Sequence, residues 1–181
     1  MKVSKTAQTS QNIPTIFLIS GPLGVGKTTL TRRLATQRKA GLINGDALFT
    51  PLKQISTLGW EKGLRITWKN ILNITTQYLD NGLDVVIDFT VQDELKWFVK
   101  ELKKHGTPFD LRYIVLLTDS KTLLSRLEKK KGSKQFVESA LSSLTALSKD
   151  PLNKPYVCHT TGRTPSELVA ICLLEKFKYK G

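Results

Sequence analysis

Short apolar runs alternate with stretches of helical periodicity from Pro14 onward. Five runs are rich in β-branched and aliphatic residues and end at turn-forming residues, which is typical of strands buried within a sheet. Between the runs, apolar residues recur every three or four positions, which predicts helices with one buried face. Because strands and helices alternate, the pattern predicts an α/β domain with a parallel sheet. The predicted strands cover residues 15–19, 42–44, 84–88, 111–117 and 156–158.

Capping signals mark where the predicted helices begin and end. Gly82 suits a left-handed C-cap after a long helix, Thr90 is predicted to start the next helix, and Ser120 to cap the one after it. The run Thr164-Pro-Ser-Glu167 fits a capping box with proline at the first helical position. Six helices are predicted. The first lies between the glycine-rich turn and Gly41, the second covers residues 61–80, and the fifth covers residues 134–148. The third, fourth and sixth begin at residues 90, 120 and 164.

The 181 residues suffice for one domain with a substantial core. No apolar run approaches the roughly 20 residues of a membrane-spanning helix, and residues 1–14 lack the apolar stretch of a secretory signal. We therefore expect a cytoplasmic protein with no membrane segment, in which a flexible segment, residues 1–13, precedes a single domain, residues 14–181. Cys158 and Cys172 lack the spacing of metal ligands and are expected to be buried as small apolar side chains.

An excess of basic residues is the one unusual bulk property. The chain has 28 Lys and Arg against 15 Asp and Glu, which gives a net charge of +13. Such a charge attracts phosphate-bearing molecules of any kind and does not choose among them. The densest basic group consists of Arg126, Lys129, Lys130, Lys131 and Lys134.

One glycine-rich run has a specific chemical meaning. Gly21-Pro-Leu-Gly-Val-Gly-Lys-Thr28 fits the pattern G-x-x-x-x-G-K-[ST], with a predicted buried strand before it and an amphipathic helix after it. Glycines let successive backbone N–H groups converge on phosphate oxygens, and the following helix points its positive end at the same anion. Lys27 is expected to bridge the β- and γ-phosphates of a nucleoside triphosphate, and Thr28 to ligate Mg²⁺. The predicted nucleotide-binding residues of this run and its flank are Gly21, Leu23, Gly24, Val25, Gly26, Lys27, Thr28 and Thr29.

Two aspartates follow predicted strands, at the edge where ligands of open α/β sheets gather. Asp88 ends one strand and resembles the Walker-B carboxylate that holds Mg²⁺; the alternative is a helix-capping aspartate. Asp46 follows the second strand, where it can accept the proton of an acceptor hydroxyl during phosphoryl transfer; the alternative is a turn or cap residue. The run Asn153-Lys-Pro-Tyr156 lacks the final aspartate of a guanine-reading N-K-x-D motif, which argues against a GTPase.

Taken together, these residues resemble P-loop kinases of the adenylate-kinase-like class, in particular the zeta-toxin, chloramphenicol-phosphotransferase and polynucleotide-kinase-like branch. The resemblance covers Thr15 to Glu175. It implies a three-layer P-loop NTPase fold, with a five-stranded parallel sheet in the order 2-3-1-4-5, helices on both faces, and a small lid over about residues 126–136. The resemblance is carried by residues 21–28, Gly45-Asp46, residues 85–88 and the run from Val115 to Arg126.

The resemblance also implies roles for three arginines. Arg126 matches the residue that begins a mobile lid and neutralises the transferring phosphoryl group. Arg163 lies in a run that looks like the loop beside the adenine, and Arg65 lies in a segment that commonly covers the acceptor in similar kinases. One departure concerns the lid, because related lids usually carry two or more arginines, whereas lysines follow Arg126 here.

These observations favour an ATP- and Mg²⁺-dependent phosphotransferase that moves the γ-phosphate to a hydroxyl of a small molecule, nucleoside or nucleotide. Two alternatives stay open. The +13 charge and the lysine cluster are also compatible with a nucleic-acid-end kinase or nucleic-acid-binding module. The lysine-rich lid is also compatible with an ATP-binding regulatory protein without transferase activity. Catalysis is assigned to Lys27, Asp46, Asp88 and Arg126, acceptor binding to Asp46 and Arg65, and Mg²⁺ binding to Thr28 and Asp88.

Overall fold

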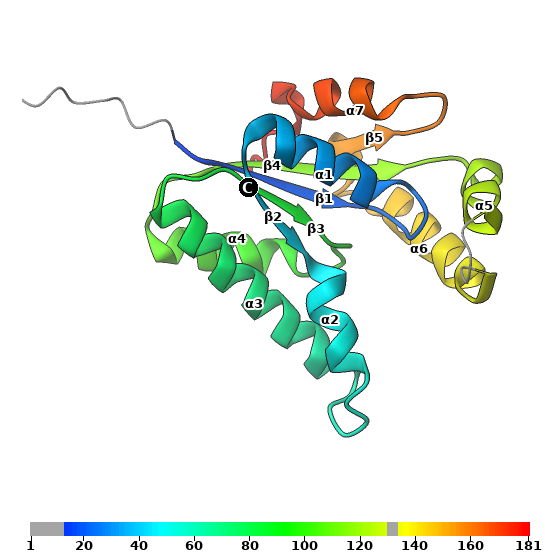
Figure 1. Ribbon diagram of the computed structural model, residues 1–181, viewed down its shortest axis with the longest axis horizontal. Helices are drawn as coiled ribbons and strands as arrows, with labels where there is room; N and C mark the ends of the chain where they lie inside the picture. The colour runs from blue at the N-terminus through cyan, green and yellow to red at the C-terminus, as the bar shows by residue number, and fades with distance from the viewer. Residues whose placement is uncertain (1–12, 130–133) are drawn as a thin grey trace, which may run out of the picture.

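A five-stranded parallel sheet forms the centre of the computed structural model, which describes residues 13–129 and 134–181. The strands lie in the order β2-β3-β1-β4-β5, which confirms the predicted order (Figure 1). In the parallel register, Ile19 of β1 pairs with Asp88 of β3, and Ser20 pairs with Val115 of β4. The strands are β1 (Thr15–Ser20), β2 (Gly41–Asn44), β3 (Val85–Asp88), β4 (Asp110–Leu117) and β5 (Val157–His159).

Helices cover both faces of the sheet and complete the three-layer P-loop NTPase fold. Helices α1 and α7 lie on one face, and α3, α4 and α6 lie on the other, while α2 and the start of α3 project beyond the sheet (Figure 1). None of the described helices is long and apolar enough to cross a membrane. The helices are α1 (Lys27–Arg38), α2 (Gly45–Lys53), α3 (Trp60–Asp80), α4 (Leu95–His105), α5 (Ser120–Lys129), α6 (Val137–Lys149) and α7 (Pro165–Cys172), with short 3₁₀ turns at Lys134–Phe136, Lys154–Tyr156 and Glu175–Phe177.

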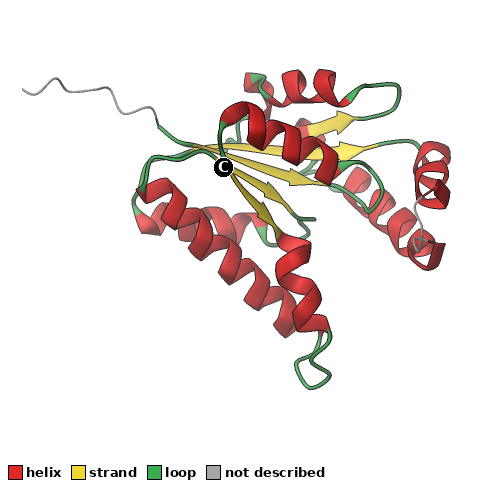
Figure 2. Cartoon of the chain, in the orientation of Figure 1, coloured by secondary structure: helices red, strands yellow, loops and turns green. Residues whose placement is uncertain are grey.

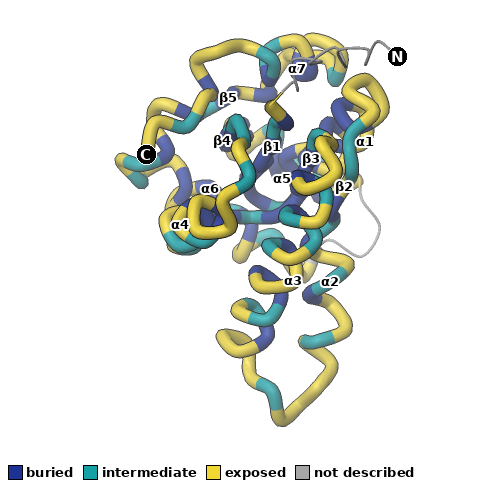
Figure 3. Tube along the Cα trace, turned by 90° about the vertical axis from the view of Figure 1, so that its left-hand side faces the viewer, coloured by how far each residue is buried: buried dark blue, intermediate teal, exposed yellow. Residues whose placement is uncertain are grey.

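The core lies between the sheet and its two helical layers. Every residue of β3 is buried, as are Ile16 to Ile19 of β1, because helices cover both faces of these central strands (Figure 3). This explains why these strands read as continuous apolar runs rather than as alternating ones. Cys158 and Cys172 are buried and unpaired, as expected.

The loops at one edge of the sheet carry the predicted chemistry. All five strands are parallel, so their carboxyl ends meet at the same edge, where the loop from β1 to α1 lies (Figure 2). After β5, at the same edge, the capping box predicted at Thr164 is present: its hydroxyl accepts the N–H of Glu167, and the Glu167 carboxylate accepts the N–H of Thr164.

Two local predictions are wrong, each for a physical reason. Thr90 does not start a helix: α4 begins at Leu95, and the Thr90 hydroxyl instead donates to the Gly21 carbonyl at 2.9 Å. Ser120 is the first residue of α5 rather than its cap, because the Asp119 carboxylate accepts the N–H of Thr122 at 2.8 Å. Hydrogen bonds from Thr122 and Thr161 hold the pKa of Asp119 well below its usual range.

Two further differences concern the region after the first helix. Gly41 belongs to β2, and α1 instead ends at a left-handed residue, Lys39. The helix α2 was not predicted, and it begins where the Asn44 side chain accepts the N–H of Ala47 at 3.1 Å. Asparagine is a strong N-cap, so the signal was present in the sequence, but the helix has only 9 residues and carries a proline inside it.

Candidate functional site

The loop between β1 and α1 has the backbone conformation of a phosphate cradle. Gly21, Gly24 and Gly26 have φ angles of 143°, 84° and 107°, a region that side chains strongly disfavour. A Cβ at Gly24 would lie 2.8 Å from the Leu127 side chain, so α5 packs directly against the loop. All three glycines are therefore required for the curl of the loop, and Gly21 and Gly24 also for its packing.

The first turn of α1 completes this cradle with backbone donors. Gly26 is the N-cap, and no side chain caps the helix, so its first backbone N–H groups have no intrahelical acceptor. No acidic residue lies in that turn. The Lys27 ammonium, nearly buried, donates to the carbonyls of Gly21 at 2.6 Å and Pro22 at 3.1 Å. A helix N-terminus with a lysine inside the loop is a favourable site for an anion.

Asp88 and Thr28, the two predicted Mg²⁺ ligands, are in direct contact. The Thr28 hydroxyl donates to Asp88 Oδ2 at 2.8 Å, and the Thr31 hydroxyl lies 3.4 Å from the same oxygen. The other oxygen, Oδ1, is buried and has no hydrogen-bond partner among the residues that the structure describes. Burial raises the pKa of Asp88, and the nearby charge of Asp46 acts in the same direction, against the opposing effects of Thr28 and Lys27.

This pair fits a magnesium ion. A buried carboxylate oxygen without a partner is costly in a folded protein unless a ligand or ion satisfies it. Mg²⁺ prefers carboxylate and hydroxyl oxygens, and it is commonly held by one or two protein oxygens together with substrate phosphates. The donor set of Asp88 and Thr28, beside a phosphate cradle, has this chemistry, although no cluster of three acidic, His or Cys ligands exists among the described residues.

Asp46 lies in the first turn of α2, at the same edge of the sheet. The residue before it, Gly45, fits against a ring: a Cβ there would lie 2.3 Å from Phe89. Phe89 follows Asp88 directly in the chain, so the contact positions α2 relative to the end of β3. Asp46 lines the cavity of the phosphate loop, and its charge acts on Asp88.

Arg126 reaches the phosphate loop from α5. One guanidinium nitrogen donates to the Val25 carbonyl at 2.9 Å and to the Thr160 hydroxyl at 3.0 Å, and the other contacts the Thr160 carbonyl at 3.5 Å. The predicted lid begins at this residue, but residues 130–133 lie outside the described residues. The arginine therefore links three segments: the phosphate loop, α5 and the loop after β5.

One cavity of about 540 Å³ brings most of the predicted residues together. It is lined by the phosphate loop and by Asp46, Arg126, Thr160 and Arg163. Arg65 does not line it; the structure places this residue on α3, beside a separate hollow. Pro165 and Leu168 of α7 also line the phosphate-loop cavity.

Three hydroxyl residues support the site and were not predicted as part of it. Thr90 donates to the Gly21 carbonyl, the Ser20 side chain accepts the N–H of Val91 at 2.9 Å, and Thr160 holds Arg126. Thr90 and Ser20 lie close to the ends of β3 and β1, and that position is the only sequence signal that marks them. These bonds fix the segment after Asp88 against the phosphate loop.

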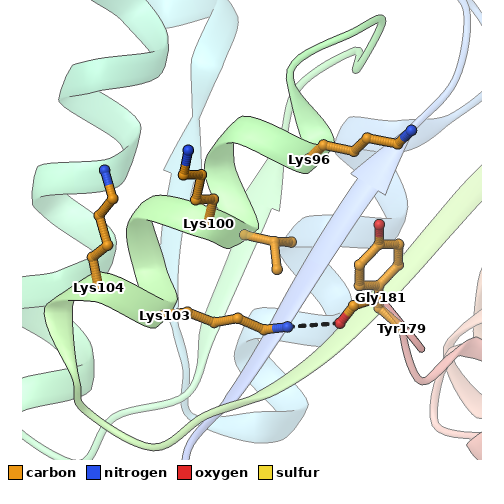
Figure 4. Close-up of a pocket in the computed structure, with 7 residues that line it drawn as sticks. Lys96, Lys100, Lys103, Lys104, Tyr179 and Gly181 are labelled. Atoms are coloured by element: carbon orange, nitrogen blue, oxygen red, sulfur yellow. Dashed lines mark hydrogen bonds between the residues drawn. The ribbon is translucent and has the colours of Figure 1, made fainter.

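A second basic hollow lies away from this cavity, between α4 and the C-terminal segment (Figure 4). Lys96, Lys100, Lys103 and Lys104 project from α4, and the Tyr179 ring lies opposite them. Lys103 donates to the Gly181 carbonyl at 2.7 Å, and Lys104 pairs with Glu101. No ion pair of Lys96 or Lys100 is found in the part of the chain that the structure describes.

Comparison with known proteins agrees with this geometry. The chain belongs to the AAA domain family, whose model matches residues 16–151. No curated protein matches the chain. Among solved structures, it is similar to a sugar kinase from Janibacter, at 19% identity and a TM-score of 0.66, covering 90% of this chain and 93% of that one.

Two further structures show the same fold. A gluconokinase from Sinorhizobium meliloti is 17% identical, with a TM-score of 0.60, and the match covers 89% of this chain and 90% of that one. A shikimate kinase from Bacteroides thetaiotaomicron is 18% identical, with a TM-score of 0.57, over 87% and 95% of the two chains. These three neighbours are kinases by name, and the narrower resemblance to the zeta-toxin branch stays a prediction.

Proposed function

We propose that the protein is an ATP- and Mg²⁺-dependent phosphotransferase that acts on a hydroxyl group of a small molecule. The observation that carries the proposal is the convergence on one edge of the sheet of the phosphate loop, the Thr28–Asp88 pair and Asp46. A triphosphate held by the loop would present its terminal phosphate beside two carboxylates, one suited to the metal and one to the acceptor. The gluconokinase, sugar kinase and shikimate kinase to which the chain is similar are named for small acceptors, which supports this class.

The proposed step is an in-line displacement. The acceptor oxygen forms a bond to the γ-phosphorus, the bond from that phosphorus to the β,γ-bridging oxygen breaks, and ADP leaves. Asp46 orients the acceptor and takes its proton, while Lys27 and Arg126 offset the charge of the phosphoryl group. Thr28 and Asp88 would hold Mg²⁺, which would neutralise phosphate charge when bound.

The proposal is tested by transfer from labelled ATP to a panel of alcohols, sugars and nucleosides. Lys27→Ala should abolish ATP binding in calorimetry with Mg²⁺ present. Asp46→Asn should keep ATP affinity and lose about 10²- to 10⁴-fold in transfer rate, because only proton transfer and acceptor orientation are removed. Glu138→Gln, an exposed change on α6, is the charge-matched control and should behave as wild type.

Two results would argue against the proposal. Transfer at the wild-type rate in Asp46→Asn would exclude Asp46 from the reaction. ATP binding without transfer to any acceptor would favour the regulatory nucleotide-binding protein that the lysine-rich lid segment left open.

A nucleic-acid acceptor is the second candidate, and the lysine-lined hollow of Figure 4 favours it. Lysines with an interleaved aromatic ring suit a sugar-phosphate backbone and a stacked base. A chain of the Pnkp1/Rnl/Hen1 RNA repair complex shares the fold, at 18% identity and a TM-score of 0.54, over 80% of this chain and 49% of that one. Oligonucleotide affinity should then fall steeply with salt, and Lys96→Ala with Lys100→Ala should flatten that dependence. A flat response in the wild type would exclude this acceptor.

A further inference from the structure

A hollow of about 340 Å³ lies between α3 and the start of α4, apart from the phosphate-loop cavity. Its walls are mainly apolar, and two tryptophans contribute to them, Trp68 from α3 and Trp97 from α4. Trp68 is only 1% exposed, and its ring is held between Phe89 and Phe98 at centroid distances of 5.4 and 5.5 Å. The Trp68 ring therefore forms a rigid part of the wall, while the Trp97 side chain is partly exposed.

The charged residues around this hollow are mainly acidic. Glu61, Asp93 and Glu94 line it, and Arg65 is the only basic residue that does. None of these four side chains forms an ion pair within residues 13–129 and 134–181. Glu94 is oriented by the N–H of Gln92, which donates to Oε2 at 2.9 Å. The hollow thus carries an excess of two negative charges.

This sign is opposite to that of the rest of the protein. The chain has a net charge of +13, and the hollow of Figure 4 is lined by four lysines. A local negative potential on a basic protein repels phosphate-bearing ligands and attracts cations. A ligand for this site therefore differs in charge from the nucleotide bound at the phosphate loop.

We propose that the hollow binds the methylated ammonium group of a small organic cation. Indole rings attract cations through their negative faces, and they also shield methyl groups from water. The carboxylates at the opening add Coulombic attraction without requiring a hydrogen-bond donor on the ligand. A neutral ligand of the same shape gains the apolar contact alone. The proposal is independent of the phosphotransferase reaction, since neither Asp46 nor Lys27 lines the hollow.

Choline provides the probe, and the neutral alcohol in which carbon replaces its nitrogen provides the matched control. Binding to the full-length protein is followed by tryptophan fluorescence and by calorimetry. We expect saturable binding of choline, about tenfold tighter than that of the neutral alcohol, because the attraction of the partly exposed Trp97 ring and of the excess carboxylates acts on the cation only. Equal affinity for the two compounds would overturn the proposal, as would the absence of saturable binding up to about 20 mM choline.

Matched tryptophan variants locate the site. Trp97→Leu should weaken choline binding about 2- to 5-fold and leave the affinity for ATP unchanged. Trp60→Leu is the control, because Trp60 is exposed and packs on Phe49 and Lys53 outside the hollow. Equal effects of the two variants would refute the assignment. Asp93→Asn with Glu94→Gln, which leaves the buried Trp68 in place, should reduce the preference for choline over the neutral alcohol, and an unchanged preference would also refute it.

Discussion

Replacing Asp88 by asparagine should stabilise the ligand-free protein while weakening its response to Mg²⁺ and ATP. Asp88 is 3% exposed, one of its oxygens has no partner, and burial raises the pKa of the carboxyl group above its ordinary value of 3.8. A raised pKa means that the surroundings disfavour the ionised form, even with the hydrogen bond from Thr28 and the charge of Lys27. Asparagine has the same shape and no charge, so the penalty is removed.

The magnitude follows from the cost of such a group. A buried charged or polar group without a partner costs about 1–3 kcal/mol. The amide of asparagine also lacks a full set of partners at this position, so we expect a net gain of about 1–2 kcal/mol. For a domain of this length, 1 kcal/mol corresponds to about 2–4 °C, and Tm should rise by about 2–8 °C.

Thermal unfolding measured with and without ligand separates this effect from a general change in stability. Wild type should gain about 2.7 kcal/mol from Mg²⁺ and ATP at 100 times the Kd, whereas Asp88→Asn should gain much less, so the order of the two Tm values reverses. Thr36→Val is a suitable control, because the Thr36 hydroxyl is exposed and bonds only within α1.

The dependence on pH gives a second readout. The folded protein holds the Asp88 proton more tightly than the unfolded chain does, so the penalty is complete above the raised pKa and disappears as the pH falls below 3.8. The Tm difference between variant and wild type should therefore shrink on acidification. A lower Tm for Asp88→Asn at neutral pH, or a difference that grows in acid, would refute the reasoning.

Three other substitutions test the supports of the site. Gly45→Ala introduces a Cβ 2.3 Å from the Phe89 ring, so α2 must shift; we expect transfer to fall at least tenfold with ATP affinity unchanged, and an unaltered rate would contradict this. Thr164→Ala removes the capping box of α7 and should cost about 1 kcal/mol, measured by denaturant unfolding, with Ser166→Ala as the control. Arg126→Lys loses the paired contacts to Thr160, and the transfer rate should fall by a larger factor than the affinity for ATP. A larger loss of ATP affinity than of transfer rate would mean that the guanidinium binds the nucleotide before the reaction rather than stabilising the transition state.

The strands and the phosphate loop were predictable because their signals are local. A strand buried on both faces must be apolar along most of its length, and residues 16–19 and 85–87 meet that requirement. The curl of the loop needs glycine at positions of positive φ, so the positions of Gly21, Gly24 and Gly26 indicate the backbone conformation of the loop. The long helix α3 ends as its pattern predicts, with Gly82 in the left-handed region just after it.

Other features depended on which segments meet in space. Thr90 resembles a helix cap in the sequence, yet its hydroxyl finds the carbonyl of Gly21, which lies 69 positions away. The partner of Arg126, Thr160, is 34 positions away, and no spacing rule marks it. Arg65 lies on the face of α3 that is turned toward α4, and only the packing of the two helices decides that face.

The sequence by itself determined the order of the elements, the phosphate cradle and the residue types available for chemistry, because these depend on short-range sterics and on the burial of apolar runs. Only the tertiary structure decided that Asp88 keeps an unpaired oxygen beside Thr28, and that the acidic residues gather around two tryptophans between α3 and α4. Desolvation and Coulombic attraction act through space, so their strength depends on neighbours that the chain brings together only after it has folded.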